Sequence, residues 1–269
     1  MSAPTLGLIV NTCNQPDYLG RVLAAVSGQS EAPQEVILAD DGSADDTRRL
    51  FGRWAQEQSS RCEQVWQERQ GFRRARILNL AIAQAQADYV VFLDGDTVPH
   101  PQFIADHRAL AHPGYFVQGH RALVESQASK WFGTRQFAFD RRQTILRWQL
   151  RGLKHAFRWP RPQRRIRADL DGIRGCNLGI WRADLLRVNG YDEEFTGWGR
   201  EDSELAVRLM NNGVRRLDVR GWACCFHLWH LPASRIGLAN NDSRLATAIA
   251  NHATRCEHGL NQHLVAADA

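Results

Sequence analysis

The chain has 269 residues, 43% of them hydrophobic and 23% charged, with a formal net charge of +5. This composition is typical of a folded globular protein and excludes a disordered, collagen-like or coiled-coil chain. No apolar run approaches the roughly 20 residues that span a bilayer, and the first residues lack the basic segment that opens a signal peptide. The six cysteines include no C-x-x-C pair and are too sparse for a disulfide scaffold, so we expect reduced thiols in a soluble cytoplasmic protein.

Short apolar runs alternate with amphipathic segments from the N-terminus to residue 93. The apolar runs predict strands at residues 6–11, 35–40, 62–67 and 89–93. Apolar residues at helical spacing predict helices that begin at Asp17, which would cap the first of them, at Asp45 and at Arg74. Alternation of this kind forms right-handed βαβ units, so we predict a parallel sheet.

The second half of the chain is less regular. We expect short strands at residues 114–119 and 177–181, a helix over 202–212, and one or two strands within 216–226. Beyond Arg235 the sequence is polar, with weak helical patterning over 245–253. No Pro/Gly/Ser-rich linker divides the chain, so we predict one α/β domain. Its two halves are residues 1–120 and 121–235, and residues 236–269 form a polar C-terminal tail.

Acidic residues follow two of the predicted strands. Asp40 and Asp41 end one strand, and Asp94 and Asp96 follow the strongly apolar run 89–93. Ligands of open parallel sheets bind at the carboxyl ends of the strands. A D-x-D turn with Gly95 in the middle places two carboxylates close together, and hard oxygen ligands of this kind hold Mg²⁺ or Mn²⁺. Surface turns contain Asp and Gly by chance, so the shared position at strand ends carries the argument.

Positive charge is concentrated in residues 130–167. This segment has twelve Lys and Arg residues and one acid, Asp140, interleaved with seven aromatic residues. Such a stretch attracts anions, and nucleic acid, anionic lipid and phosphorylated glycan all qualify. The alternative is a solvated helix face whose aromatic residues point into the core.

Several motifs together resemble a known family. Four of them resemble the nucleotide-sugar half of family-2 glycosyltransferases with the GT-A fold: I-V-N-T-C (9–13), V-I-L-A-D-D-G-S (36–43), R-Q-G-F-R-R-A-R (69–76) and F-L-D-G-D-T-V-P (92–99). A fifth, F-T-G-W-G-R-E-D-S-E (195–204), is similar to the G-W-G-x-E-D block of β-1,4-galactosyltransferases and bacterial chondroitin polymerases. The resemblance covers roughly residues 4–230.

The resemblance implies a fold and an activity. The fold would be a Rossmann-like, mostly parallel sheet flanked by helices, with a C-terminal elaboration on the acceptor side. The activity would be metal-dependent transfer of a sugar from a nucleotide-sugar, a UDP-sugar, to a glycan or lipid-linked glycan. The setting would be bacterial-type assembly of surface polysaccharide or lipopolysaccharide. Residues 1–120 would bind the nucleotide-sugar, and residues 121–235 would hold the acceptor and catalytic half.

The resemblance also assigns the donor site. Asp40 or Asp41 would accept a hydrogen bond from the uracil base, beside Thr12. Arg74 or Arg76 would lie near the nucleotide. Asn177, in the motif G-C-N-L-G (175–179), would contact the donor sugar.

A metal site is implied in the same way. Asp96 would ligate Mn²⁺ or Mg²⁺, with Asp94 beside it touching ribose or sugar. In the related enzymes a distal His completes the site, and here both His227 and His230 are candidates, with His227 aligning better. The alternative for either His is an ordinary core or surface imidazole. Gly95 follows the wider family-2 pattern rather than that of the galactosyltransferases.

The G-W-G-x-E-D block would supply the catalytic groups. In the inverting relatives the Asp of Glu-Asp is the general base, so the resemblance assigns that role to Asp202, beside Glu201, and favours inversion. The structural alternative is that Asp202 only caps the helix that follows. Trp198 would offer a flat apolar face to a sugar ring, and its alternative is a core tryptophan.

Two other functions compete. A nucleotidyltransferase usually has a Gly-rich phosphate loop after its first strand, and residues 11–16 contain no Gly. A non-enzymatic module that binds nucleic acid or an anionic membrane has no need of acidic residues at three strand or helix ends. We therefore expect an enzyme with no nucleic-acid partner, in peripheral contact with the inner face of the cell membrane through the basic segment.

Overall fold

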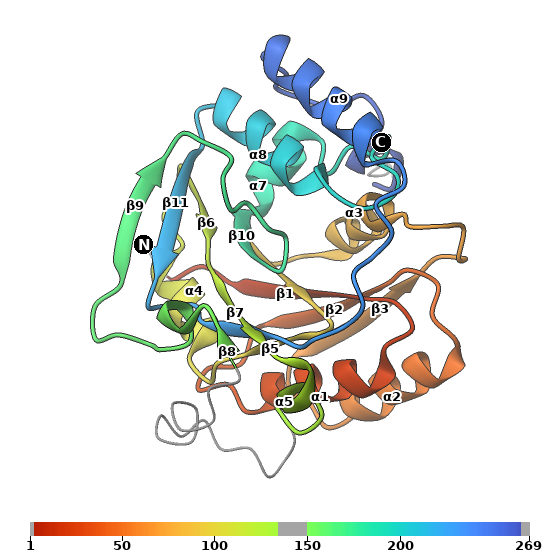
Figure 1. The fold of residues 1–269 in the computed structure, drawn as a ribbon, viewed down its shortest axis with the longest axis vertical. Helices are drawn as coiled ribbons and strands as arrows, with labels where there is room; N and C mark the ends of the chain where they lie inside the picture. Colours follow the sequence, from red (N-terminus) through yellow and green to blue (C-terminus); the bar gives the residue numbers. More distant parts are fainter. Residues whose placement is uncertain (1–2, 134–149, 265–269) are drawn as a thin grey trace.

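In the residues that the structure describes, eight strands form the central sheet, in the order β3-β2-β1-β4-β10-β6-β11-β9 (Figure 1). The computed structural model describes residues 3–133 and 150–264, so part of the basic segment, residues 134–149, lies outside the described residues. Four strands run parallel: β3 (Arg61–Trp66), β2 (Glu35–Asp40), β1 (Leu6–Thr12) and β4 (Tyr89–Asp94). The others are β10 (Asn177–Trp181), antiparallel to β4 and β6 (Tyr115–Gln118), then β11 (Arg215–Arg220), parallel to β6, and β9 (Gln163–Arg167), antiparallel to β11.

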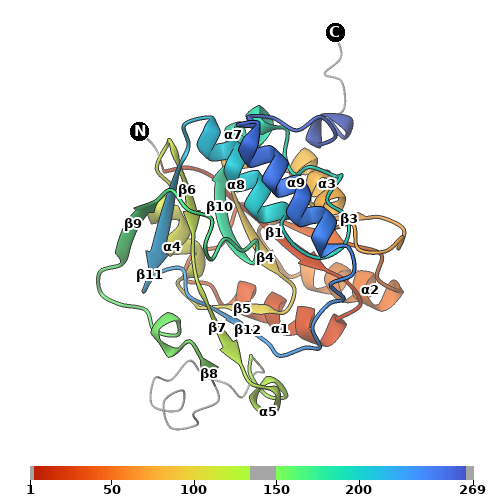
Figure 2. The same ribbon diagram turned by 45° about the horizontal axis from the view of Figure 1, so that its top comes forward.

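Helices cover both faces of this sheet. On one side lie α1 (Pro16–Ser27), α2 (Asp45–Ala55) and α4 (Phe103–Leu110). On the other lie α3 (Arg74–Gln84), α7 (Arg182–Val188) and α8 (Glu201–Asn211), with α9 (Leu238–Ala250) beside α8 (Figures 1 and 2). Strand β1 is buried on both faces, because Leu8 and Val10 pack toward the first layer and Ile9 toward the second.

A second, smaller sheet lies over the carboxyl end of β4. Its order is β5 (Thr97–Pro99), β12 (Cys225–His227), β7 (Arg121–Val124) and β8 (Leu150–Arg151). Val98, Phe226 and Ala122 pair side by side and are buried in the core. Because side chains alternate along a strand, their sequence neighbours on β12 and β7 face the other way. The remaining short elements are α5 (Ser126–Ser129), η1 (Leu153–His155) and η2 (Leu260–Gln262).

The sequence predicted most of the sheet. Strands β2 and β10 have the predicted bounds, and β1, β3 and β4 differ from them by one residue. None of the short elements β5, β7, β8, β9 and α4 was expected, because each is brief or has the polar composition of a loop. No helix in the described ranges is long and apolar enough to cross a bilayer.

Two helix predictions need correction. Asp17 does not cap α1, because Gln15 holds the N-cap position and Asp17 lies in the first turn, near the positive end of the helix dipole. The C-terminal tail forms a helix from Leu238 to Ala250, which begins seven residues before the predicted start. Asn241 is the one buried residue of this helix. A helix that buries so little needs no apolar stripe, which explains the weak helical pattern in its sequence.

A buried ion pair anchors α8. The guanidinium of Arg208, which has no exposed surface, donates to both carboxylate oxygens of Glu204 at 2.6 Å. The same guanidinium donates to the backbone carbonyls of Val188 and Gly190. These contacts fix α8 against the end of α7, and so fix the residues at the start of α8.

We expect that removing the charge of one partner of this pair destabilises the folded protein. Glu204→Gln should lower the free energy of unfolding by about 3 kcal/mol, because it leaves a buried cation without its counter-charge. Urea unfolding followed by circular dichroism measures this as a lower transition midpoint. The exposed pair Asp45–Arg48 on α2 is the control, and Asp45→Asn should cost less than about 1 kcal/mol. Equal effects of the two variants would show that the buried pair does not anchor α8.

Candidate active site

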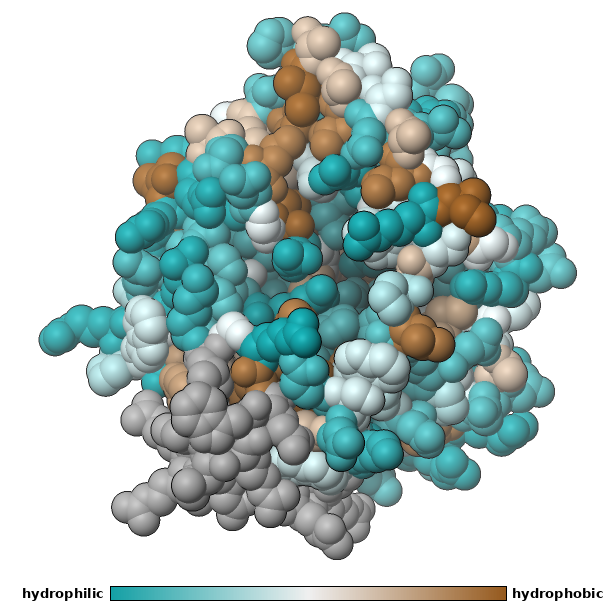
Figure 3. Space-filling model, viewed as in Figure 1, coloured by the Kyte–Doolittle hydropathy of each residue, from teal (hydrophilic) through white to brown (hydrophobic). Residues whose placement is uncertain are grey.

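The carboxyl ends of β1, β2 and β4 meet at one edge of the sheet. Thr12 pairs with Asp40, and Asn11 pairs with Asp94. Gly95 continues from β4 with its N–H donating to the carbonyl of Asn11 at 2.7 Å. A Cβ at Gly95 would lie 3.0 Å from Thr12, so glycine allows the expected close approach of the two strand ends. The surface on the side viewed in Figure 1 is hollowed near its centre, where mostly hydrophilic residues line the recess (Figure 3).

Asp40 and Asp41 are both buried, each with its own donors. Asp40 accepts hydrogen bonds from the N–H of Ser43 and the amide of Gln64, and burial raises the pKa of Asp40. Asp41 accepts from the amide of Gln67 at 2.6 Å and from a backbone N–H. The two carboxylates are therefore held rigidly at the end of β2.

The other residues expected at the nucleotide surround this pair. Thr12 is 5% exposed, and its hydroxyl has no hydrogen-bond partner within the described parts of the chain. Arg76 donates to the same Gln67 that binds Asp41, at 2.7 Å. Arg69 forms an ion pair with Asp41 at 3.3 Å. An unpartnered hydroxyl beside two fixed carboxylates is a site that can accept a polar ligand.

Arg74 joins the two acidic motifs. Its guanidinium forms ion pairs with Asp94 at 3.3 Å, with Glu201 at 3.2 Å and with Asp202 at 2.9 Å. Burial and the adjacent charge of Asp202 together raise the pKa of Glu201 to about 7, against the opposing effect of Arg74. Burial also raises the pKa of Asp94, which the Arg74 charge partly offsets.

Asp202 is not a helix cap. The N-cap of α8 is Arg200, in the left-handed conformation with φ of 81°, and Asp202 lies within the first turn. The Oδ2 atom of Asp202 accepts from the N–H of Gly175 at 2.7 Å, and its Oδ1 accepts from Arg74 and from the hydroxyl of Tyr191 at 3.3 Å. The side chain is 18% exposed. Asp202 is thus a fixed carboxylate that reaches solvent and can accept a proton.

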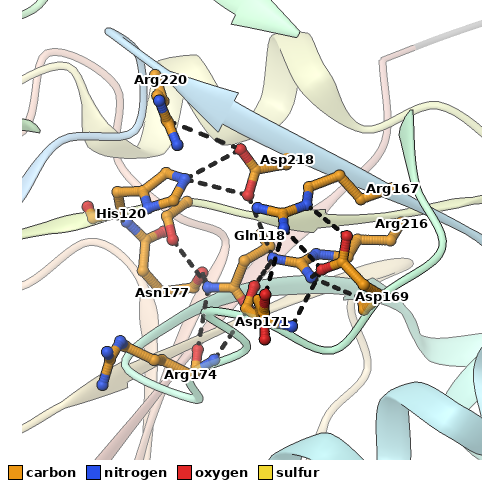
Figure 4. A network of polar contacts seen from close by, with 11 residues as sticks. Gln118, His120, Arg167, Asp169, Asp171, Arg174, Asn177, Arg216, Asp218 and Arg220 are labelled. Atoms are coloured by element: carbon orange, nitrogen blue, oxygen red, sulfur yellow. Dashed lines mark hydrogen bonds and ion pairs between the residues drawn. The ribbon is translucent and has the colours of Figure 1, made fainter. Parts of the chain in front are cut away.

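The loop that carries Gly175 is held by a polar network (Figure 4). The amide of Gln118 donates to the carbonyls of Arg174 and Asn177, and its oxygen accepts from the N–H of Arg174. The fully buried Arg216 donates to the carbonyls of Asp169 and Asp171. Strands β6 and β11 therefore set the position of the N–H that binds Asp202.

Asn177 has a structural part in the same region. It is 1% exposed, and its amide donates to the carbonyls of His120 and Ala223 while its oxygen bonds the ring of His107 at 2.9 Å. These bonds use its polar atoms to hold β10 to its neighbours. The expected contact with a donor sugar has no support in this geometry, because a buried amide with these partners does not face the recess.

Asp96, His227 and His230 could hold a metal ion. Their ligand atoms all lie within 4.8 Å of one another. The Nε2 atom of His230 is 3.1 Å from Asp96 and 3.3 Å from the Nε2 atom of His227. Both candidate histidines thus join the group, whereas Asp94 pairs with Arg74. A carboxylate and two imidazoles form a donor set for a divalent transition metal.

The electrostatics of this group depend on burial and on Asp96. Burial lowers the pKa of His227 to about 4, which keeps its imidazole neutral as metal binding requires. The hydrogen bond to Asp96 raises the pKa of His230. Although burial raises the pKa of Asp96, the hydrogen bond from His230 and the electrostatic effect of the two nearby imidazoles lower it overall.

Trp198 is not a core residue. It is 39% exposed, in the loop just before α8. The guanidinium of Arg235 lies over its ring at 5.2 Å from the centroid. The indole is therefore held at the surface by a cation–π contact, where it can pack against a ligand.

Four residues that shape this region gave no sequence signal. Gln118 and Tyr191 look like ordinary strand and loop residues, and Arg216 lies in a run of charges that is typical of a solvated strand. Arg121, on β7, follows a short strand with no motif around it. Their positions depend on tertiary contacts between segments far apart in the chain, which spacing alone does not encode.

Two family models match the chain. The model of glycosyl transferase family 2 matches residues 8–172, and the model described as the N-terminal domain of galactosyltransferase matches residues 157–230. The second match contains the loop of Trp198, the acidic start of α8 and both histidines of the metal group.

Curated relatives include several sugar transferases and synthases. The chain is 30% identical to validoxylamine A glucosyltransferase of Streptomyces hygroscopicus subsp. limoneus over 237 residues, which cover 78% of this chain and 49% of that one. It is 25% identical to chondroitin synthase of Escherichia coli over 243 residues, covering 82% and 34%. The chain thus spans half or less of the length of these relatives.

Solved structures show the same fold. A mannosyltransferase from Pyrobaculum calidifontis, in complex with GDP-Man and Mn²⁺, superposes with a TM-score of 0.63 at 22% identity and covers 93% of this chain and 65% of that one. TarS of S. aureus gives a TM-score of 0.62 at 15% identity and covers 96% and 41%. The fold is that of the GT-A glycosyltransferases, as the motifs predicted. Because the family-2 model spans more than half of the sequence, the chain belongs to the family-2 glycosyltransferases.

Proposed function

We propose that the protein transfers a sugar from a UDP-sugar to a hydroxyl group of a glycan or lipid-linked glycan, with inversion at the anomeric carbon. One observation carries the proposal: the three residues that could hold a metal ion are linked through neighbouring residues to a fixed carboxylate. Asp96 of the metal group is separated from Asp94 by Gly95 alone, and Asp94 is joined to Asp202 through Arg74. Such a site has a place for a leaving diphosphate and a base for the attacking hydroxyl.

The metal group suits Mn²⁺ better than Mg²⁺. Mg²⁺ strongly prefers oxygen ligands, whereas His227 and His230 offer two nitrogens beside one carboxylate of Asp96. A divalent ion held there would neutralise the charge of the leaving diphosphate. The Mn²⁺ in the complex of the Pyrobaculum mannosyltransferase, which has the same fold, supports this choice.

Asp202 acts as the general base in this proposal. It accepts the proton of the acceptor hydroxyl while the hydroxyl oxygen bonds to the anomeric carbon from the face opposite the leaving group. Arg74, Tyr191 and the N–H of Gly175 hold its carboxylate in place. Glu201, with a pKa of about 7, is partly protonated at neutral pH and leaves more of the Arg74 charge to Asp202.

The donor nucleotide would lie at the ends of β1 and β2. Asp40 or Asp41 and the unpartnered hydroxyl of Thr12 offer polar contacts to the base. Residues 1–120 form this donor half, and residues 121–235 form the acceptor half with Trp198 as a platform for a sugar ring. The match to chondroitin synthase supports a role in the assembly of surface polysaccharide or lipopolysaccharide.

The acceptor side carries exposed positive charge. Arg161, Arg164 and Arg165 are exposed on and just before the edge strand β9. We assign them to attraction of a phosphorylated or lipid-linked acceptor at an anionic membrane, rather than of nucleic acid. Each such residue near an anionic leaflet contributes about 1 kcal/mol. The first experiment is a screen of UDP-sugars and GDP-mannose for slow hydrolysis with Mn²⁺, which a binding module would not catalyse.

Asp202→Asn should lower sugar transfer by roughly 100-fold or more, the usual scale for a positioned base, while Mn²⁺-dependent binding of UDP persists. The amide oxygen still accepts the N–H of Gly175, so the fold should survive. Asp45→Asn, at an exposed carboxylate on α2, is the matched control and should keep full activity. Activity near that of the wild type would remove Asp202 from the mechanism. A product with retained anomeric configuration in the NMR spectrum would exclude inversion.

Asp96→Ala should weaken Mn²⁺-dependent binding of UDP more than about tenfold, because the ion loses its one carboxylate ligand. Isothermal titration with and without Mn²⁺ measures the effect. Asp45→Ala, at an exposed position on α2, should bind UDP like the wild type. An affinity of the Asp96 variant within about threefold of the wild type would mean that the metal binds elsewhere.

Replacing Arg161, Arg164 and Arg165 together by Gln should weaken binding to anionic liposomes and raise the apparent KM for the acceptor, with donor hydrolysis unchanged. Wild-type binding should fall steeply with salt, because the Debye length shrinks from about 10 Å at 0.1 M to about 3 Å at 1 M. The control replaces three exposed arginines of α2, namely Arg48, Arg49 and Arg53. If both triple variants sediment with liposomes like the wild type, β9 is only a solvated edge.

A further inference from the structure

Arg121 is a partly enclosed cation that forms no direct ion pair in the part of the chain that the structure describes. Within residues 3–133 and 150–264, no carboxylate oxygen lies within 4.0 Å of its guanidinium. Among the same residues its buried Nε atom has no hydrogen-bond partner, and its Nη1 atom donates to Cys176 Sγ at 3.4 Å. The buried arginines Arg74, Arg208 and Arg216 all have carboxylate partners. Arg121 differs from them because its guanidinium has donors that no carboxylate occupies, so it is suited to bind an anionic ligand.

The position of Arg121 places that ligand inside the proposed active site. On the small sheet Arg121 pairs with Cys225, and Leu123 pairs with His227, so Arg121 and His227 face the same side. On its other side Arg121 contacts Cys176, which directly follows the Gly175 that binds Asp202. Arg121 therefore lies between the metal group and the loop that holds the proposed base.

The charges in this region act on one another. Although burial lowers the pKa of Arg121, the charges of Cys176, Asp94 and Asp96 raise it overall, so this guanidinium stays charged. Burial lowers the pKa of His227, Asp96 opposes that shift, and Arg121 adds to it. These effects agree with the position of Arg121 between the two groups.

We propose that Arg121 binds the terminal phosphate of the departing nucleoside diphosphate, and this rests on the proposed function. In the transfer, the bond between the anomeric carbon and the phosphate oxygen breaks, and its electron pair remains on that oxygen. The acceptor oxygen bonds to the anomeric carbon, and its proton passes to Asp202. The planar guanidinium donates hydrogen bonds to the phosphate oxygens on which negative charge develops. A metal ion would neutralise this charge from one side of the phosphate, and Arg121 would do so from another.

A different role for Arg121 predicts a different effect of its removal on the binding of Mn²⁺ and UDP. If Arg121 only offsets the charges of Asp94 and Asp96, it repels a divalent cation and touches no phosphate. Its removal would then strengthen Mn²⁺ binding and leave the affinity for UDP at saturating Mn²⁺ unchanged. The proposal predicts that removal weakens UDP binding even when Mn²⁺ saturates its site.

The experiment compares Arg121→Met and Arg121→Lys with the wild type by isothermal titration. The probes are Mn²⁺ alone, and then UDP and UMP at saturating Mn²⁺. Arg121→Met should weaken UDP binding about tenfold or more, equivalent to about 1.4 kcal/mol, while UMP and Mn²⁺ bind within about threefold of the wild type or more tightly. Arg121→Lys should recover part of the lost affinity, because lysine keeps the positive charge but lacks the planar group that can donate two parallel hydrogen bonds to a phosphate. Arg53→Met, an exposed arginine of α2, is the matched control.

Each outcome decides the question. Unchanged affinity for UDP overturns the proposal, and so does an equal loss for UDP and UMP, which would indicate a distorted site. Loss of hydrolysis of UDP-glucuronate alone, with UDP binding intact, would place a sugar carboxylate at Arg121 instead. If the wild type binds neither UDP nor GDP with Mn²⁺, the proposed function itself fails, which is distinct from a failure at Arg121. Thermal unfolding midpoints close to the wild type show that each variant is folded.

Discussion

The ion pairs of Arg74 are the interaction on which the rest of the site depends. This guanidinium, 7% exposed, faces carboxylates from two distant parts of the chain, Asp94 at the end of β4 and Glu201 with Asp202 at the start of α8. Without it, three acidic groups would face one another in a largely buried space, where like charges repel strongly. Arg74 lets the end of the sheet and the start of α8 approach closely enough to share one site.

The surrounding chain is built to keep that contact close. A Cβ at Gly175 would come within 2.3 Å of the Arg74 guanidinium and 2.4 Å of Asp202, so no larger residue fits there without a shift. Gln118 and Arg216 hold the loop of Gly175 from one side, and the pair Glu204–Arg208 holds α8 from the other. Three separate sets of buried polar contacts thus converge on one carboxylate, as a preorganised site requires.

The sequence predicts the features that depend on local apolar patterns better than those that depend on contacts between distant residues. Apolar runs are a local feature of the sequence. They predicted the bounds of β2 and β10, and they placed Asp40 at the end of one strand and Asp96 just after another. Buried ion pairs are not local. The motifs predict Arg74 or Arg76 near the nucleotide, and they do not reveal that Arg74 pairs with Glu201 and Asp202. The position of Asp202 at a helix start is typical of a cap, whereas its partners include Gly175 and Tyr191. The motif around Asn177 predicts a contact with a ligand. The hydrogen bonds from its amide to the carbonyls of His120 and Ala223 are visible only in the folded structure.

The edge strand β9 has a consequence for how molecules of this protein meet. In the described parts of the chain it is one of the two edge strands of the large sheet, with β11 as its neighbour on one side (Figure 1). Its sequence, Q-R-R-I-R, puts arginines around Ile166, which is 59% exposed. An open strand edge invites pairing with another chain, and charged side chains along it oppose that pairing by repulsion. The arginines of β9 therefore oppose extension of the sheet into a second molecule.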